Sequence, residues 1–242
     1  MQTYQQLLET KLKTRWEPID PIYTPIHPAL QETIARAVAF KELELSVASF
    51  LESASKRDLP VDEYGWKLMA SNQHDEEVHD IALSKLAASL PFYTDRPEVL
   101  QIKSQFEDLA NRCHPIEVAR TLESGVFFVC LGILRVLGSV ATRNVASDVL
   151  RDEAIHVATN TQIAKSLGVY NQYPQLERLR RDAVAWLTEE LLPDRIPAAY
   201  AKYDQSFWLS KNFSGKDMEN EVTKATYMAF FEVDRRNQPV YN

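Results

Sequence analysis

The chain has 242 residues, of which 45% are hydrophobic and 25% are charged, which is enough for one large domain with a full core. The formal net charge of −7 and the lack of a basic run argue against nucleic acid and an anionic membrane surface as partners. Two cysteines make no disulfide framework, the N-terminus is too polar for a secretory signal, and the longest apolar stretch (126–140) is short and contains Arg135. We therefore expect a cytoplasmic protein without a membrane span.

The first elements in chain order are helices separated by prolines. Residues 2–13 predict a short amphipathic helix, and four prolines between 18 and 28 then exclude regular structure. Apolar residues at helical spacing predict a long helix from about 29 to 56. Glu44 falls on its apolar stripe and Glu42 lies off it, so Glu44 is the preferred core-facing carboxylate and Glu42 the alternative.

A second helix is expected from Asp62, which fits an N-cap, to about residue 89. Its broad apolar face includes Glu76 and His79. A loop or a short helix covers residues 95–112, between two proline-rich breaks.

Pro115 fits the first turn of a third helix that runs to about residue 140. This helix is apolar almost all round, so we expect it to be central. Glu123 lies inside it, where a charge is costly unless it is paired or bound to a metal. Phe127 and Cys130 follow Glu123 on the same face.

A fourth helix is expected at about 144–167, because Gly168 fits the residue just after a helix end. It carries three residues of interest: Asp152, Glu153 and His156. Pro174 opens an accessory helix, and Ser214 fits the N-cap of a last helix to about residue 235. With only 6 glycines and no Asn-Gly or Asp-Gly turn, the chain predicts an all-α fold. We expect one domain over residues 1–242, with a four-helix bundle core at about 29–167 and accessory helices at 174–235.

Two runs share the pattern Asp-Glu-x-x-His, at residues 75–79 and 152–156. In each run the glutamate and the histidine are three residues apart, so on a helix they lie on one face. Each run follows a lone glutamate at a similar distance, 32 residues from Glu44 to Glu76 and 30 from Glu123 to Glu153. Ferritin-like bundles hold two metal ions with this set of side chains. The sequence therefore predicts a ferritin-like bundle with these metal ligands: Glu44, Glu76, His79, Glu123, Glu153 and His156.

The ligand types narrow the choice of metal. Two divalent ions neutralise four carboxylates, which would otherwise repel one another in a buried site. Carboxylates mixed with two imidazoles suit iron or manganese better than magnesium or calcium, and zinc stays open. Asp75 and Asp152 precede the two histidines by four residues, and we expect each to hydrogen-bond an imidazole across the pseudo-twofold axis and fix its tautomer.

Two segments carry a family resemblance: Leu122-Glu123-Ser124-Gly125-Val126-Phe127-Phe128 and Leu150-Arg151-Asp152-Glu153-Ala154-Ile155-His156. With these segments the chain resembles the ferritin-like di-iron carboxylate superfamily, and within it most closely the radical-generating small subunit (R2-like) of class I ribonucleotide reductase. The resemblance covers roughly residues 35–165. By position it carries over the same glutamates and histidines as ligands. It implies O₂ activation at a centre of two iron ions or of one manganese and one iron ion.

Two departures from that family shape the functional expectation. Leu83 stands where the radical tyrosine usually lies, and little of the chain follows the last predicted helix. We therefore expect an O₂-activating oxidase or oxygenase for a small, partly apolar organic substrate, in a pocket lined by Leu83, Phe127 and Cys130. It would work as a homodimer with an electron donor. One alternative is a radical-generating reductase subunit with Trp16 and Tyr241 on the transfer route, and another is an iron-storage ferroxidase.

Overall fold

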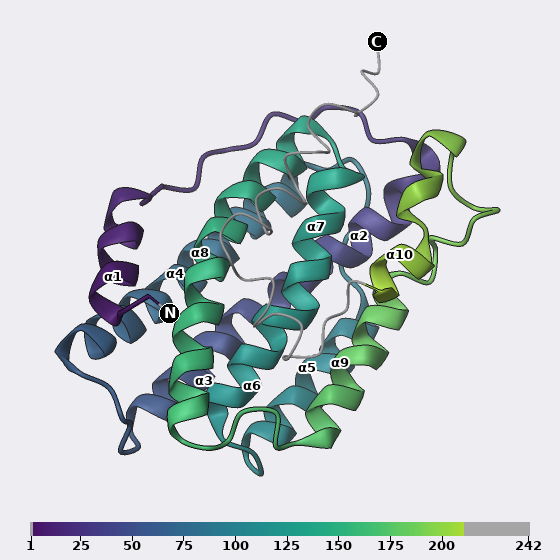
Figure 1. Cartoon of the computed structure of the whole chain (residues 1–242). Helices are drawn as coiled ribbons and strands as arrows, with labels where there is room; N and C mark the ends of the chain where they lie inside the picture. The colour runs from purple at the N-terminus through teal and green to yellow at the C-terminus, as the bar shows by residue number, and fades with distance from the viewer. Residues whose placement is uncertain (1, 211–242) are drawn as a thin grey trace.

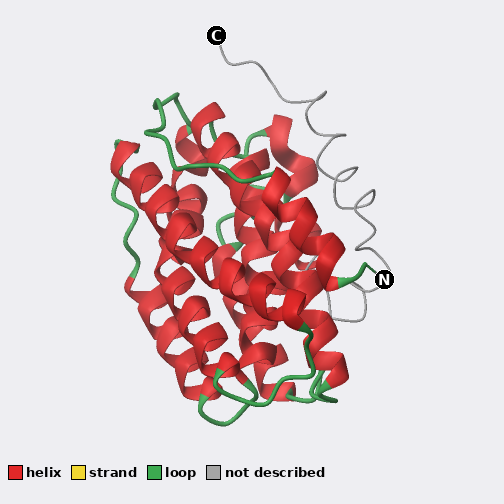
Figure 2. Ribbon diagram, turned by 90° about the vertical axis from the view of Figure 1, so that its left-hand side faces the viewer, coloured by secondary structure: helices red, strands yellow, loops and turns green. Residues whose placement is uncertain are grey.

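The computed structural model describes residues 2–210, and within this range every regular element is helical and no strand occurs (Figure 2). The predicted all-α fold is confirmed for that range. The helix expected from Ser214 to about 235 and Tyr241 lie outside the described residues. The assignment of residues 1–242 to one domain stays a prediction.

The first helix, α1 (Tyr4–Lys13), lies against α4 and α8 (Figure 1). It begins with a capping box: the Thr3 hydroxyl accepts from the Gln6 amide at 3.2 Å, and the Gln6 side chain accepts from the Thr3 amide at 2.9 Å. Leu7 packs in a small apolar cluster with Leu68 of α4 and Ile155 of α8. This cluster holds α1 over the two helices that carry the repeated motif.

The single helix expected at 29–56 is wrong in detail, because the segment is broken by a tighter turn. It consists of η1 (Pro28–Leu30), α2 (Gln31–Ala39), the 3₁₀ turn η2 (Phe40–Leu43) and α3 (Glu44–Ser55). Side chains three residues apart eclipse in a 3₁₀ turn. Phe40 and Leu43 are both buried, so the tighter winding keeps both in the core where α3 begins.

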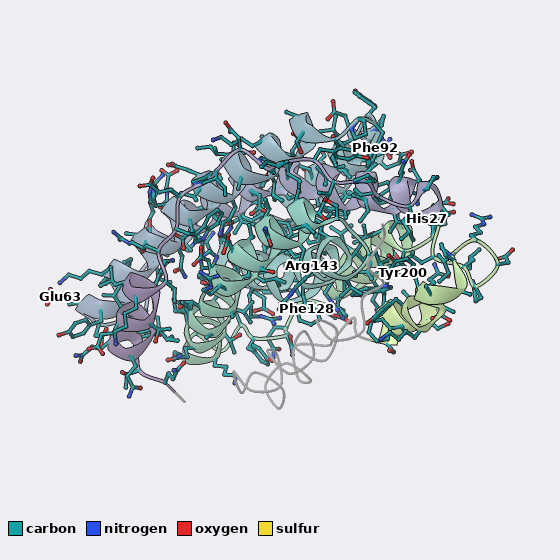
Figure 3. The ribbon with its side chains drawn as sticks, turned by 90° about the horizontal axis from the view of Figure 1, so that it is seen from above. His27, Glu63, Phe92, Phe128, Arg143 and Tyr200 are labelled. Atoms are coloured by element: carbon teal, nitrogen blue, oxygen red, sulfur yellow. The ribbon has the colours of Figure 1, made fainter. Side chains whose placement is uncertain are left out.

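Helix α4 (Glu63–Ser89) begins as predicted, since the Asp62 carboxylate accepts from the Gly65 amide at 2.8 Å. It runs across the molecule: Glu63 at its start and Phe92 just beyond its end lie on opposite sides (Figure 3). The segment left open as loop or short helix is a full helix, α5 (Pro97–Ala110).

The uniform helix expected from Pro115 to about 140 is also wrong in detail. It divides into α6 (Pro115–Thr121), the π-helical segment η3 (Leu122–Phe127) and α7 (Phe128–Val136), all buried. A β-carbon on Gly125 would lie 2.1 Å from Cδ of Arg180 on α9 (Pro174–Leu187), so only glycine permits this approach. Single π turns inside α-helices are frequent at functional sites, and this one carries Glu123.

Helix α8 (Val140–Ser166) begins earlier than the predicted residue 144, because the Ser139 hydroxyl caps it by accepting from the Thr142 amide at 3.4 Å. Gly168 follows its end with φ of 70°, a conformation that favours glycine. Beyond α9 the described chain ends with η4 (Ala198–Tyr203) and α10 (Gln205–Ser210).

Four helical segments surround the centre of the molecule. They are α3, α4, the segment from α6 to α7, and α8. Helix α3 packs against α4 and α6, and α8 packs against α4, α6 and α7, so the four segments enclose a common interior. Helices α5 and α9 pack together on the far side from α1 (Figure 1). Within residues 2–210, no helix combines the length and the apolar character that crossing a membrane requires.

Candidate metal centre

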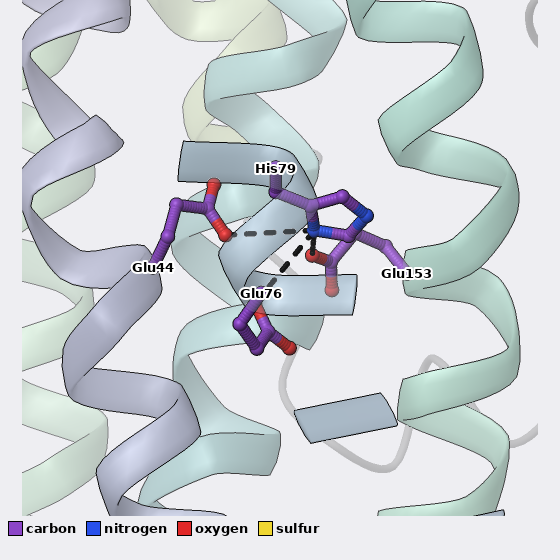
Figure 4. A group of neighbouring side chains, drawn as sticks. All are labelled: Glu44, Glu76, His79 and Glu153. Carbon is purple, nitrogen blue, oxygen red and sulfur yellow. Dashed lines mark ion pairs between the residues drawn. The ribbon is translucent and has the colours of Figure 1, made fainter. Parts of the chain in front are cut away.

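The six predicted ligand side chains converge in the interior, from α3, α4, η3 and α8. Each is at most 1% exposed. Their potential ligand atoms form two groups, and within each group the atoms lie within 4.8 Å of one another. The first group is Glu44, Glu76, His79 and Glu153 (Figure 4). The second group is Glu76, Glu123 and His156.

The first group centres on His79 Nδ1. Oε1 of Glu153 lies 3.3 Å from this nitrogen, Oε2 of Glu44 lies 3.6 Å away, and Oε2 of Glu76 lies 3.7 Å away (Figure 4). Three different helices therefore bring one carboxylate oxygen each to one imidazole nitrogen.

The second group centres on His156 Nδ1. Oε1 of Glu76 lies 3.0 Å from it and Oε2 of Glu153 lies 3.7 Å from it. Glu76 and Glu153 thus each turn one oxygen to each imidazole, and Glu76 belongs to both groups. Glu44 belongs to the His79 half and Glu123 to the His156 half.

The atoms at the centre of the site have no hydrogen-bond partner. His156 Nδ1 and Glu76 Oε1 are close, but they do not have the geometry of a hydrogen bond. Buried polar atoms almost always have a partner, so a cluster without partners needs an explanation. The buried atoms in question are Glu44 Oε2, Glu76 Oε1 and Oε2, His79 Nδ1, Glu153 Oε1 and Oε2, and His156 Nδ1. They fit the ligand shell of a metal ion, and these Glu and His groups could hold one.

Each imidazole turns its other nitrogen to an aspartate of the opposite helix. His79 Nε2 lies 3.3 Å from Asp152 Oδ2, and His156 Nε2 lies 3.0 Å from Asp75 Oδ2. An N–H at Nε2 that donates to the aspartate leaves the Nδ1 lone pair free to face the carboxylates. The aspartates therefore select the tautomer that a metal needs.

Glu123 has a partner that sequence reasoning missed. The Asn160 side-chain amide donates to both of its carboxylate oxygens, at 3.0 and 2.8 Å. Asn160 lies four residues after His156, so it shares a face of α8 with the motif. That spacing is the signal that could have identified it.

Burial and mutual repulsion raise the pKa of two carboxyl groups. Burial raises the pKa of Glu44 well above its usual value. Burial also raises the pKa of Glu123, to about 8, and the charge of Glu153 adds to this shift. In the metal-free protein the Glu123 carboxyl therefore holds a proton at neutral pH.

The pKa values of the two imidazoles and of Glu76 shift in the direction that ion pairing produces. Burial acts to lower the pKa of His79, but contact with four carboxylates, Asp152 first, raises it well above the usual value. His156 behaves in the same way, raised chiefly by Glu76. Burial acts to raise the pKa of Glu76, but the two imidazoles, His156 first, hold it below the usual range. In the metal-free protein these contacts therefore favour the protonated form of both imidazoles.

Two side chains from the N-terminal segment reach the site, and the motif gives no sign of them. Trp16 donates from its indole Nε1 to Asp152 Oδ2 at 2.7 Å, and its ring stacks on His79 with centroids 6.2 Å apart. The Lys11 ammonium is 2% exposed and forms an ion pair with Asp75. The signal for Lys11 is its position on the buried stripe of α1, four residues after Leu7.

The structure also separates alternatives that the sequence left open. Glu44 is buried in the site, whereas the side chain of Glu42 is 37% exposed and pairs with Lys41.

The proposed pocket residues Leu83, Phe127 and Cys130 are all buried, and the Cys130 thiol donates to the Ala37 carbonyl at 2.8 Å. Their role towards a substrate stays a prediction.

Comparisons with protein-family models, with curated proteins and with solved structures find no significant match to this chain. The case for function therefore depends on the chemistry of the site.

Proposed function

We propose that the chain is a dinuclear metal oxidoreductase that activates O₂, built on a ferritin-like bundle of α3, α4, the α6–α7 segment and α8. The observation that carries the proposal is the set of buried carboxylate oxygens and imidazole nitrogens that face one another without hydrogen bonds. Such atoms destabilise a core that holds no ligand, because each unsatisfied buried polar group costs about 1–3 kcal/mol.

The arrangement supports two ions. Glu44 and His79 would hold one and Glu123 and His156 the other, and Glu76 and Glu153 would contribute to both, since each turns one oxygen to each imidazole. Four carboxylates balance two divalent cations. The mixture of oxygen and nitrogen donors favours iron, or manganese with iron, over magnesium or calcium.

The residues around the ligands hold them for that task. Asp75 and Asp152 keep the imidazole protons on Nε2, and Asn160 orients the Glu123 carboxylate. Burial of all six ligands excludes bulk water. Bound iron, or manganese with iron, would supply the redox chemistry with O₂. Buried apolar groups near Glu44 and Glu123, among them Cys130 and Phe127, favour a small, partly apolar organic substrate.

Reconstitution with Fe²⁺ without air, followed by O₂, tests this function. We expect uptake of about two ions per chain, then O₂ consumption with a new absorption band. Glu44→Ala should lose one ion and the O₂ reaction. Glu42→Ala is the matched control, because Glu42 is on the adjacent turn and partly exposed, and it should behave as the unmodified protein. Metal uptake without O₂ consumption would refute the oxidase function and leave a metal site.

One observation favours a second candidate, a radical-generating reductase subunit. Trp16, Asp152 and His79 form a continuous contact from a partly exposed indole to a candidate ligand. Such a chain can carry an electron coupled to a proton. If it does, Trp16→Phe should slow the reduction of the oxidised centre by an external donor while leaving metal uptake unchanged. An unchanged rate of reduction would remove this candidate.

A further inference from the structure

The side chains that cover the two halves of the candidate metal centre differ in charge. Over the His156 half, the Lys11 ammonium forms an ion pair with Asp75 and donates to Asn72 Oδ1 at 2.6 Å. Its Nζ also lies 3.4 Å from His156 Nε2. Over the His79 half, the corresponding aspartate, Asp152, receives the neutral Trp16 indole at 2.7 Å. A cation thus stands where the other half has a neutral donor.

The two covering side chains, Lys11 and Trp16, come from one short stretch of chain, in α1 and just after it. Thr3 to Lys13 is fixed by its capping box and by the small cluster of Leu7, Leu68 and Ile155. Lys11 is 2% exposed, so solvent does little to screen its charge. The asymmetry is therefore built into the fold and does not depend on a mobile surface side chain.

We infer that Lys11 makes the two metal positions unequal, so that the Glu44–His79 position fills first and the Glu123–His156 position fills second and more weakly. An aspartate that accepts from a ligand histidine makes the imidazole a better donor to metal. Asp75 shares its charge with Lys11, so it does this less well for His156 than Asp152 does for His79. The ammonium also repels a second cation in a poorly screened interior.

A separate contact also favours weaker metal binding at the Glu123–His156 position. Both oxygens of Glu123 already accept from Asn160, at 3.0 and 2.8 Å, whereas Glu44 Oε2 has no hydrogen-bond partner. An ion at the second position must displace or share these hydrogen bonds. An ion at the first position meets a carboxylate oxygen without that competition.

The inference depends on the proposed two-metal site, and a Mn²⁺ titration without air distinguishes the two. Free Mn²⁺ is followed by electron spin resonance, so no activity is needed. The unmodified protein should bind in two steps, the second weaker by about tenfold or more, the range that contacts behind metal ligands usually produce. Glu44→Ala should remove the tight step and Glu123→Ala the weak one.

Lys11→Met should tighten the second step by about tenfold and leave the first step unchanged. Lys13→Met is the matched control, because it removes the same charge from the exposed face of the same helix and should change neither step. Lys11→Arg keeps the cation and should keep two unequal steps. If Lys11→Met does not fold, Lys11→Gln makes the same test with a polar side chain.

Two equal steps in the unmodified protein, or an unchanged ratio of the two affinities in the Lys11→Met and Lys11→Gln variants, would overturn the inference and leave the two-metal site in place. Absence of Mn²⁺ binding by the unmodified protein would overturn both.

Discussion

The buried segment from Leu122 to Val136 has two ends of opposite chemistry. In η3, Glu123 lies beside the carboxylates of Glu76 and Glu153 and the imidazole of His156, and many atoms of these groups have no hydrogen-bond partner. About three turns later, in α7, Ile133 and Leu134 are fully buried among apolar neighbours. Burial of the apolar side chains at the α7 end stabilises the fold. The carboxylate end costs stability unless something positive occupies it, so its role should be binding.

The largest expected effect concerns the shared carboxylates. Glu76 faces both imidazoles, so Glu76→Ala should abolish uptake of both ions. Glu77→Ala removes a carboxylate at the next position, where the side chain is 60% exposed, and should leave uptake intact. Metal analysis after reconstitution without air measures both variants. Full metal uptake by Glu76→Ala would contradict the binding role assigned to the carboxylate end of the segment.

The second effect belongs to the apolar end. Leu134 is fully buried, so Leu134→Ala should lower the free energy of unfolding by about 2–5 kcal/mol, through lost burial and a residual cavity. Chemical denaturation of the metal-free protein measures this loss. Metal stoichiometry should not change, because Leu134 belongs to neither group of candidate ligands.

The third effect is a pH dependence of the metal-free protein. The pKa of Glu123 is raised from 4.5 to about 8, so the folded state holds this proton more tightly than the unfolded chain. The resulting stability is complete below about pH 4.5 and is lost as the pH rises through about 8. The raised pKa values of His79 and His156 act with the same sign above about pH 6.5. The free energy of unfolding should therefore fall between about pH 6 and pH 9.

Glu123→Gln sharpens this test. The amide has the size of the protonated carboxyl and cannot lose a proton, so the fall with pH should become shallower, while stability near pH 6 should change little. Thermal unfolding across the pH range measures both. Bound metal should reverse the trend, because it needs deprotonated ligands and binds more tightly at higher pH. A rise in metal-free stability with pH over this range would contradict the assigned shifts.

Part of this structure could be read from the sequence, because it depends on local spacing. Scarce glycine and clustered prolines predict helices, and the repeated Asp-Glu-x-x-His spacing identifies side chains that one helical face must present together. The 3₁₀ turn at Phe40–Leu43 has no proline or glycine to mark it. The need for glycine at position 125 likewise depends on packing, because Arg180 approaches it from α9.

The covers of the site could not be predicted in the same way. Lys11 meets Asn72 and His156 from 61 and 145 residues away, and Trp16 meets Asp152 from 136 residues away. No periodicity within α1 specifies such partners. A lysine on an apolar stripe indicates a buried charge, but only the packing of α1 on α4 and α8 identifies what it neutralises.

The most direct test of the central claim is a crystal structure of the protein loaded with Mn²⁺, with anomalous difference maps recorded at the manganese edge. We predict two peaks between the imidazoles of His79 and His156, each in contact with Glu76 and Glu153. Peaks only at surface carboxylates, or no peak among these four residues, would contradict the account.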